Sequence, residues 1–486
     1  MAARPRASMR VSEYFRLGRT QPFLDFLDIP VGKDIPVFLD PGRLRAMTST
    51  WATECISLLQ TFFEAFLREL RAGNRDEGVR LLAALTERNE FHLGFSRSLS
   101  AGNAFGPGYA AEVWEAMTSS NAAVTGLLQD LEDTCLFIYG IGPDRISDAV
   151  CNIIRGPLIR YTQQMCVYYG IPLQEGVDSG PVWNPQSEEW DSDLIPLPVT
   201  PYGPVLFIPK LAVRHRMIYY DADRYYRHFV MPEMQEAEKR ANSGLVHVLR
   251  DGRTRVYKKD LAETYGADKL AIIEQTNRFP EALQQYRETR MGRVSSPLTN
   301  EQLAEIEDID RPNLRSLLQE LLAVAPGRDE ANQYELAVEK LLSALFYPSL
   351  AFPTKQHEIH EGRKRIDITY VNNARSGFFG WLATHYPSAH VFVECKNYGR
   401  EVGNPEADQL AGRFSPARGQ VGLLVCRSLE NAAALQRRCR DTAQDHRGYI
   451  IFLTDQDLEQ LVSAYEAAPG ETTFQLLRDK FSALIM

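Results

Sequence analysis

A short apolar segment late in the chain carries an acid and a base at positions that a strand would place side by side. Residues 390–396 have the sequence His-Val-Phe-Val-Glu-Cys-Lys, and the apolar run is typical of a buried β-strand. Glu394 and Lys396 are two residues apart, so the pleat of a strand directs both side chains to the same face. Because an acid and a base are costly to bury without partners, this segment predicts a strand that leads into a functional site.

The sequence around this strand alternates helical and strand signals in a compact order, which predicts a small α/β fold. The expected elements are an amphipathic helix over 333–346, strands over 365–371, 421–426 and 449–453, a short helix around 378–384, and a helix that contains Gln409. The predicted core positions of the first helix are Leu336, Leu341, Leu342, Leu345 and Phe346.

A second carboxylate, Asp367, lies near the start of the strand that we expect beside residues 390–396. Two carboxylates that converge on one point form a hard-oxygen site of the kind that Mg²⁺ or Mn²⁺ prefers. A nearby ammonium such as Lys396 can position or activate the attacking water and neutralise charge that develops on a phosphate. These are the parts that hydrolysis of a phosphodiester requires.

The alternative interpretation of these residues is structural: Glu394 and Lys396 would form a surface ion pair, and Asp367 would cap a turn. The apolar run at 391–393 and the isoleucines on both sides of Asp367 argue against it, because they are typical of buried strands. We therefore favour the catalytic interpretation.

Asp367, followed after an apolar run by Glu394-Cys395-Lys396, resembles the pattern of the PD-(D/E)xK nuclease superfamily. The helix that carries Tyr334-Glu335 is similar to that of the Mrr-like restriction endonuclease branch. This resemblance spans residues 333–461 and implies a restriction-endonuclease-like α/β core, with a central mixed sheet flanked by helices. The chain departs from the pattern where Ile366 precedes Asp367 in place of the nominal proline, and in the long connection between Asp367 and Glu394.

The resemblance implies a role for each motif residue. Asp367 and Glu394, with the backbone carbonyl of Cys395, would bind Mg²⁺ or Mn²⁺, and Lys396 would act beside them. In the family an acid on the first core helix orients metal-bound water, a place that Glu335 matches, with Glu339 one turn later as the fallback. A polar residue on the helix after the catalytic strand often contributes, and Gln409 stands at that place.

The distribution of charge suggests where nucleic acid would bind. The formal net charge of −9 argues against a protein that passively coats nucleic acid, but residues 351–450 hold 14 Lys and Arg against 10 Asp and Glu. A second basic patch surrounds a hairpin predicted at Asp251-Gly252, where a solvated hairpin is the alternative explanation. The candidate nucleic-acid contacts are Arg363, Lys364, Arg365, Arg400, Arg413, Arg250, Arg253, Arg255 and Lys258.

His357, His360 and Glu361 are close in sequence and are residue types that can bind zinc. The two histidines are three residues apart in a segment that favours an extended conformation, whereas HExxH places its histidines four apart on a helix. We therefore expect a surface edge of the domain at this position.

The length of 486 residues predicts two or three domains. We expect a mainly helical α+β recognition or regulatory region over 1–300, with a further break near 170–210 and a strand at 205–208, then a linker and helix over 301–330, and the nuclease domain over 331–486. No apolar stretch could span a bilayer, no secretory signal is visible, and the seven cysteines contain no CxxC pair. These features predict a cytoplasmic protein that has no membrane partner.

The sequence thus predicts a metal-dependent endonuclease that hydrolyses DNA, as the effector of a bacterial antiviral defence or restriction system. The biological context rests on resemblance of architecture alone, since large N-terminal extensions accompany Mrr-like nucleases in such systems. A homo-oligomer is expected, and a partner protein of the defence system is allowed for.

Two alternatives stay open. One is a catalytically silent subunit of a defence complex, which would bind nucleic acid or act as a scaffold. The other is an RNA-directed nuclease, supported only by the interleaved aromatic and basic residues at 214–229. A helix that buries its tyrosines is the favoured explanation of that stretch.

Overall fold

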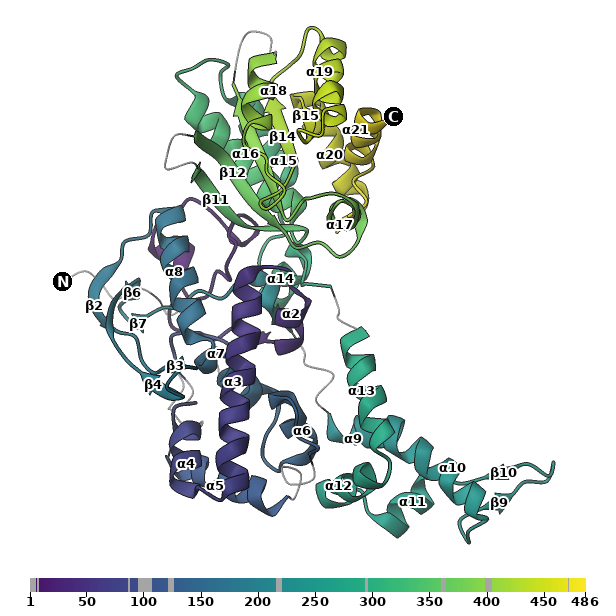
Figure 1. Ribbon diagram of the computed structural model, residues 1–486. Helices are drawn as coiled ribbons and strands as arrows, with labels where there is room; N and C mark the ends of the chain where they lie inside the picture. Colours follow the sequence, from purple (N-terminus) through teal and green to yellow (C-terminus); the bar gives the residue numbers. More distant parts are fainter. Residues whose placement is uncertain are drawn as a thin grey trace. The chain divides into compact units, whose positions relative to one another are not determined.

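The computed structural model describes residues 6, 8–85, 88–94, 107–120, 126–215, 221–292, 296–359, 364–397, 404–470 and 472–486. The chain forms two compact units, and neither is continuous in the sequence (Figure 1). Unit 1 comprises Met1–Phe15, Ile29–Ile208 and Ala212–Pro297, and unit 2 comprises Arg16–Asp28, Pro209–Leu211 and Leu298–Met486.

Helices form most of the first part of unit 1. They are α1 (Val11–Tyr14), α2 (Pro41–Ala46), α3 (Thr50–Ala72), α4 (Arg75–Ala83), α5 (Pro107–Ser119), η2 (Leu131–Asp133), α6 (Thr134–Phe137), α7 (Pro143–Ile153) and α8 (Arg155–Tyr169). Helices α2 and α3 are separate because Met47 is extended and Ser49 caps α3 by accepting from the Ala52 N–H.

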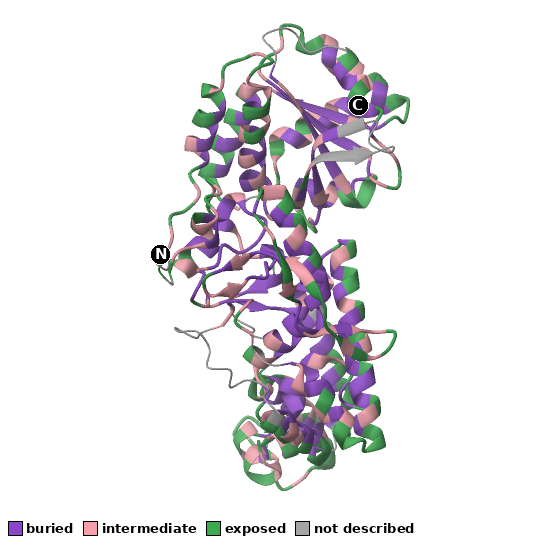
Figure 2. Cartoon of the chain, turned by 90° about the vertical axis from the view of Figure 1, so that its left-hand side faces the viewer, coloured by how far each residue is buried: buried purple, intermediate pink, exposed green. Residues whose placement is uncertain are grey.

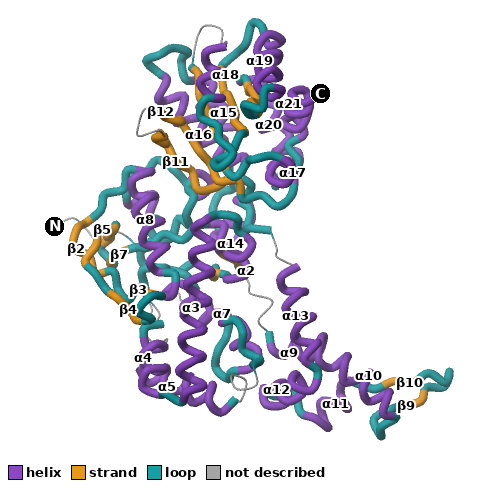
Figure 3. The backbone as a smooth tube through the Cα atoms, in the orientation of Figure 1, coloured by secondary structure: helices purple, strands orange, loops and turns teal. Residues whose placement is uncertain are grey.

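The strands of unit 1 are short and form only two-stranded ribbons within the described residues (Figure 3). They are β1 (Phe38–Leu39) with β8 (Val213–Arg214), β2 (Gln174–Asp178) with β5 (Leu194–Leu197), β3 (Val182–Asn184) with β4 (Glu189–Asp191), β6 (Val199–Thr200) with β7 (Gly203–Pro204), and β9 (His247–Val248) with β10 (Thr254–Arg255).

The strand expected at 205–208 is not formed. These four residues are completely buried, as their apolar character requires, but their backbone N–H groups bond to separate segments rather than to one neighbouring strand. Leu206 donates to the carbonyl of Glu90 and Phe207 to the hydroxyl of Thr162. Burial alone therefore explains the apolar run.

The last part of unit 1 is again helical: α9 (Ala222–Tyr225), the π-helical turn η4 (Tyr226–Val230), α10 (Met231–Ala241), α11 (Lys258–Tyr265), α12 (Lys269–Arg278) and α13 (Pro280–Gly292). Tyr225 and Tyr226 are buried, so the helix explanation of this stretch holds for both tyrosines. The stretch also contains residues 216–220, which lie outside the described part of the chain.

Unit 2 is an α/β fold around one five-stranded mixed sheet. The strands β11 (Leu350–Ile359), β12 (Lys364–Asn372), β13 (His390–Lys396), β14 (Val421–Cys426) and β15 (Tyr449–Leu453) lie in this order across the sheet. The β11–β12 and β12–β13 pairs are antiparallel, and the β13–β14 and β14–β15 pairs are parallel. This confirms the expected α/β class with a mixed sheet.

Helices cover the sheet on both sides, and its strands are mostly buried (Figure 2). The helices of unit 2 are α14 (Asn300–Glu307), α15 (Leu314–Ala323), α16 (Ala331–Phe346), α17 (Gly377–His385), α18 (Asn404–Ala411), α19 (Ala432–Gln444), α20 (Asp455–Ala467) and α21 (Gln475–Ile485), with the short η1 (Gln21–Phe23) and most of η3 (Lys210–Ala212). Helix α16 packs on β11 and β13, and α18 packs on β14 and β15.

The core of α16 differs from the prediction at one position. Leu341, Leu342, Leu345 and Phe346 are buried, but Leu336 is 40% exposed. The buried face starts at Tyr334 and continues at helical spacing, so a residue two positions after Tyr334 points to the opposite side.

Unit 2 also extends beyond the boundary expected from the sequence. Four leucines of α15, within the segment expected to be a linker and helix, belong to the core of the sheet domain: Leu314, Leu317, Leu318 and Leu321. Arg19, from the separate segment 16–28, binds the buried Glu339 of α16 through two N–O contacts of 2.9 and 2.5 Å. The backbone N–H of Phe352 donates to Asp25 at 2.9 Å. The segment 16–28, distant in sequence, is thus part of the α/β unit.

Candidate functional site

The two predicted catalytic carboxylates lie where neighbouring strands separate. The antiparallel ladder between β12 and β13 ends at the pair Ile368–Val393, although β12 continues beside β11 and β13 continues beside β14. One step further along the same register, Asp367 stands across from Glu394. Asp367 Oδ2 accepts a hydrogen bond of 2.9 Å from the backbone N–H of Cys395. At this point a side chain of β12, and not its backbone, bonds to β13.

Glu394 is almost completely buried, with 1% of its surface exposed. Its Oε1 accepts a hydrogen bond of 2.7 Å from Lys396 Nζ, and its Oε2 forms an ion pair with Arg413 Nη1. Arg413 is also buried. A buried carboxylate without compensation would be strongly destabilising, and here two cations provide that compensation.

Gln409 and Arg413 both approach this centre from the segment that follows β13. Gln409, on α18, lies at the limit of hydrogen-bond distance from Lys396, with 3.5 Å between Oε1 and Nζ. Arg413 follows the end of α18 by two residues. Burial lowers the pKa of the Arg413 guanidinium, and the charge of Asp367 opposes that shift.

The two candidate acids on α16 differ in their surroundings. Glu339 is fully buried and is compensated by Arg19 and by Lys355, whose Nζ lies 3.4 Å from Oε2. Glu335 is partly exposed. Burial raises the pKa of the Cys395 thiol well above its usual range, and the charges of Asp367, Glu335 and Glu339 add to the shift. Glu339 is already compensated by two cations, so Glu335 is the acid of the two that we carry forward to the centre.

Most of the predicted basic contacts near the centre cannot be placed. Arg363 and Arg400 lie outside the described residues, and the side chains of Lys364 and Arg365, on β12, are not described. Arg413 turns inward to Glu394. His357 lies on β11, at the edge of the sheet, which agrees with the expected edge position, whereas His360 and Glu361 fall outside the described residues.

The basic hairpin is described completely. Strands β9 and β10 project beyond the ends of α10 and α11, with the turn at Asp251-Gly252 (Figure 1). Arg253 pairs with Asp251 at 2.6 Å while its side chain stays 81% exposed, and the Arg255 guanidinium lies 5.0 Å from the ring centre of Tyr257. Lys258 begins α11 and donates to the carbonyl of Arg227.

The donor set around Asp367 fits a hard divalent cation. Two carboxylates from adjacent strands, with the carbonyl of Cys395 directly after Glu394 in sequence, supply the oxygen ligands that Mg²⁺ prefers. Glu394 already attracts two positive charges, so this position favours a cation. Across the described residues, no group of three His, Cys, Asp or Glu side chains gathers as a metal site, so any ion would depend on these two carboxylates together with backbone or water oxygens.

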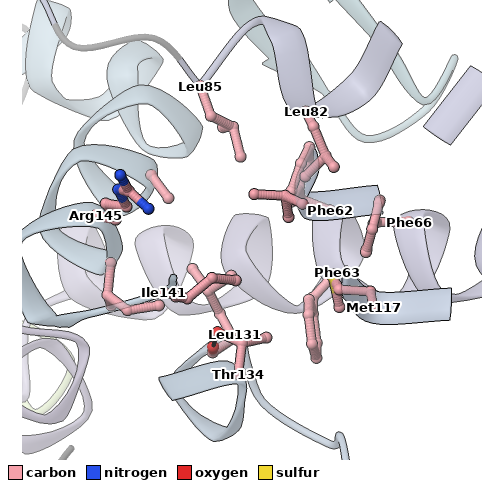
Figure 4. A pocket seen from close by; sticks show the side chains of 13 residues that line it. Phe62, Phe63, Phe66, Leu82, Leu85, Met117, Leu131, Thr134, Ile141 and Arg145 are labelled. Carbon is pink, nitrogen blue, oxygen red and sulfur yellow. Dashed lines mark hydrogen bonds between the residues drawn. The ribbon is translucent and has the colours of Figure 1, made fainter. Parts of the chain in front are cut away.

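Unit 1 contains an apolar cavity between α3, α4, α5 and α7, but it is too small for a ligand. Its volume is about 20 Å³, and its walls include Phe62, Phe63 and Leu82, with Arg145 at one side (Figure 4). That space is comparable to one water molecule. The cavity is therefore a packing void of the helical region.

The sequence did not reveal that Arg413 and Arg19 neutralise buried glutamates. Arg413 lies in the turn after α18, so its contact with Glu394 could not be inferred from helical spacing. The pairing of Arg19 with Glu339 has no local signal either, because the two residues are 320 positions apart.

Comparisons with known proteins cover only part of the chain. A family model described as "Domain of unknown function (DUF8370)" matches residues 16–221. No curated protein and no solved structure matches the chain. The matched region includes the segment 16–28 of unit 2, but not the residues of the candidate centre. In the part of the chain that is described, no helix is long and apolar enough to cross a membrane.

Proposed function

We propose that the chain is a metal-dependent nuclease of the PD-(D/E)xK superfamily, Mrr-like branch, that hydrolyses phosphodiester bonds of DNA. The observation that carries this proposal is the position of Asp367 across from Glu394 at the separation of β12 and β13, with Lys396 bound to Glu394. The mixed sheet and the helix α16 beside it also support a restriction-endonuclease-like core.

Each residue of the centre has a distinct role in the proposed reaction. Asp367, Glu394 and the Cys395 carbonyl would hold Mg²⁺ or Mn²⁺, which when bound lowers the pKa of water and neutralises charge on the phosphate. The Lys396 ammonium stabilises negative charge that develops at the scissile phosphate, and Gln409 orients that ammonium. Glu335 directs the attacking water.

Substrate binding would use the basic residues of the chain. Residues 250–259 contain five Lys and Arg and one acid, in a protein whose formal net charge is −9. Such a local excess of positive charge attracts the phosphate backbone independently of base sequence. We assign this hairpin to nucleic-acid binding as part of the same proposal.

The biological setting is proposed on architecture alone. A nuclease unit that follows a large, mainly helical region suits an effector of bacterial antiviral defence or restriction, in which the helical region responds to a trigger or a partner protein. In this proposal the protein acts in the cytoplasm as a homo-oligomer.

The decisive experiment is a cleavage assay with purified full-length protein on plasmid, linear and single-stranded DNA and on RNA, with Mg²⁺, Mn²⁺ or EDTA. Asp367→Asn, Glu394→Gln and Lys396→Met should each lower the cleavage rate by about 100-fold or more, because each removes charge aimed at the reacting phosphate. Asp408→Asn is the matched control, since Asp408 pairs with Arg438 and not with the centre. Undiminished metal-dependent cleavage by Asp367→Asn would contradict the proposal.

One observation favours a second candidate, a silent subunit that binds nucleic acid without cutting it. Both oxygens of Glu394 already face cations, as they would in a nuclease fold that has replaced its metal with side-chain charges. The same assay separates the candidates. Binding without cleavage under all metal conditions would support the silent subunit, and cleavage confined to RNA would redirect the proposal to an RNA-directed nuclease.

A further inference from the structure

Two cations face the buried Glu394 of the candidate centre. The ammonium of Lys396 lies at Oε1 and the guanidinium of Arg413 lies at Oε2. Sites that hold Mg²⁺ tightly present excess negative charge to the ion. Arg413 therefore offsets part of the negative charge that the carboxylates of the centre would present to an ion.

The two cations hold Glu394 in different ways. Lys396 donates a hydrogen bond of 2.7 Å to Oε1. Arg413 faces Oε2 as an ion pair through Nη1. Each oxygen of Glu394 therefore has its own cation, and Arg413 is the one that reaches the centre from outside β13.

Arg413 reaches Glu394 from the turn that follows α18. Its backbone N–H donates to the carbonyl of Leu410 at 3.0 Å. Its long side chain extends from that turn to Oε2 of Glu394, so the guanidinium occupies the oxygen that a metal ion would need.

We propose that Arg413 is an internal counter-cation that competes with the divalent metal ion for Glu394 and thereby sets the metal affinity of the centre. This inference rests on the proposed metal-dependent function. A guanidinium and a divalent ion cannot both neutralise Oε2 without strong mutual repulsion. Arg413 is thus a positioning residue that keeps the buried carboxylate ordered until metal binds.

The test is direct measurement of Mn²⁺ binding to full-length protein by electron paramagnetic resonance, without substrate. Arg413→Gln should lower the Kd for Mn²⁺ by about tenfold, because it removes the competing charge beside Glu394. Arg413→Lys, which retains a cation, should stay closer to wild type. Arg437→Gln is the matched control, since Arg437 is exposed on α19 and has no contact with Glu394, and its Kd should be unchanged.

Thermal unfolding shows whether Arg413→Gln still folds and gives a second measure of metal binding. Without metal, Arg413→Gln should unfold at a lower temperature than wild type, because Glu394 loses one of its two cations. Added Mn²⁺ should raise the unfolding temperature of Arg413→Gln more than that of wild type, since tighter binding to the native state stabilises it more.

The outcomes for this inference and for the nuclease proposal are distinct. An equal or higher Kd for Arg413→Gln overturns the competition, even where the wild type cleaves DNA. A lower Kd for Arg413→Gln in a protein that never cleaves would support the competition between Arg413 and the metal ion, and it would contradict the proposal that the chain is a nuclease. Absence of Mn²⁺ binding by both wild type and Arg413→Gln would overturn the competition. The cleavage assay would then test the nuclease proposal separately.

Discussion

Glu339 shows what a single buried charge requires of the rest of the chain. It lies on α16 with 0% of its surface exposed, and its partners are Arg19 and Lys355. Removal of one partner of a buried ion pair leaves an uncompensated charge, which costs more than the pair contributed. This residue therefore links the segment 16–28 to the stability of the α/β unit.

Arg19→Ala should lower the free energy of unfolding by about 3 kcal/mol, because Glu339 keeps only the more distant Lys355. Urea unfolding followed by circular dichroism measures the change. Arg315→Ala is the control, since Arg315 forms exposed ion pairs with Glu459 and Glu466 on the same unit, and its stability should stay close to wild type. Equal stability of Arg19→Ala and wild type would show that the pair is dispensable.

At the same scale, the sequence identified the central residues but not their partners. Asp367, Glu394 and Lys396 could be found because strand alternation and apolar neighbours are local properties. The compensation of Glu394 by Arg413 depends on how the turn after α18 folds back, and that is a tertiary property.

At the level of elements, prediction succeeded where local pattern and burial agree. The strands β13, β14 and β15 and the helix α16 were expected within two residues of their ends. The strand prediction failed at 205–208, where apolar residues are buried without a neighbouring strand. The burial prediction failed at Leu336 of α16, which is apolar but exposed. Hydrophobicity predicts burial, whereas a strand also requires a partner backbone.

The basic hairpin is an element whose role can be tested by salt dependence. Each phosphate contact contributes about 0.9 to the slope of log affinity against log salt concentration on duplex DNA. Joint replacement of Arg250, Arg253 and Arg255 by Ala should therefore reduce that slope by about 2 to 3, and fluorescence anisotropy over a salt series measures it.

A triple replacement of equal charge provides the control for the hairpin. Arg68, Arg71 and Arg75 are exposed at the end of α3 and the start of α4, outside the hairpin. Their replacement by Ala should leave the salt slope unchanged. If both triple variants lose the same affinity and slope, the hairpin has no specific role and only overall charge matters.

For the whole molecule, the main departure from expectation is that the α/β unit is discontinuous. We expected the nuclease domain to cover 331–486 without interruption, after a linker and helix over 301–330. The structure adds 16–28, 209–211 and 298–330 to the unit that carries the candidate centre. Lys210, for example, is buried within unit 2 and donates to Asn300 at 3.3 Å and to the carbonyl of Gln21 at 3.3 Å. Such pairings of distant segments leave no periodic signal in the sequence.

A fragment that begins at Leu298 should therefore be incompletely stable. It lacks Arg19, Asp25 and Lys210, so Glu339 loses its closest cation and the N–H of Phe352 loses its acceptor. We expect a low and broad thermal transition for this fragment. Because a ligand that binds only the native state stabilises it by mass action, a synthetic peptide of residues 16–28 should raise the unfolding temperature in a concentration-dependent manner. The same peptide with Arg19→Ala should raise it less, since it cannot neutralise Glu339. A sharp transition that neither peptide changes would mean that residues 298–486 fold independently and that the two inserted segments only lie against them.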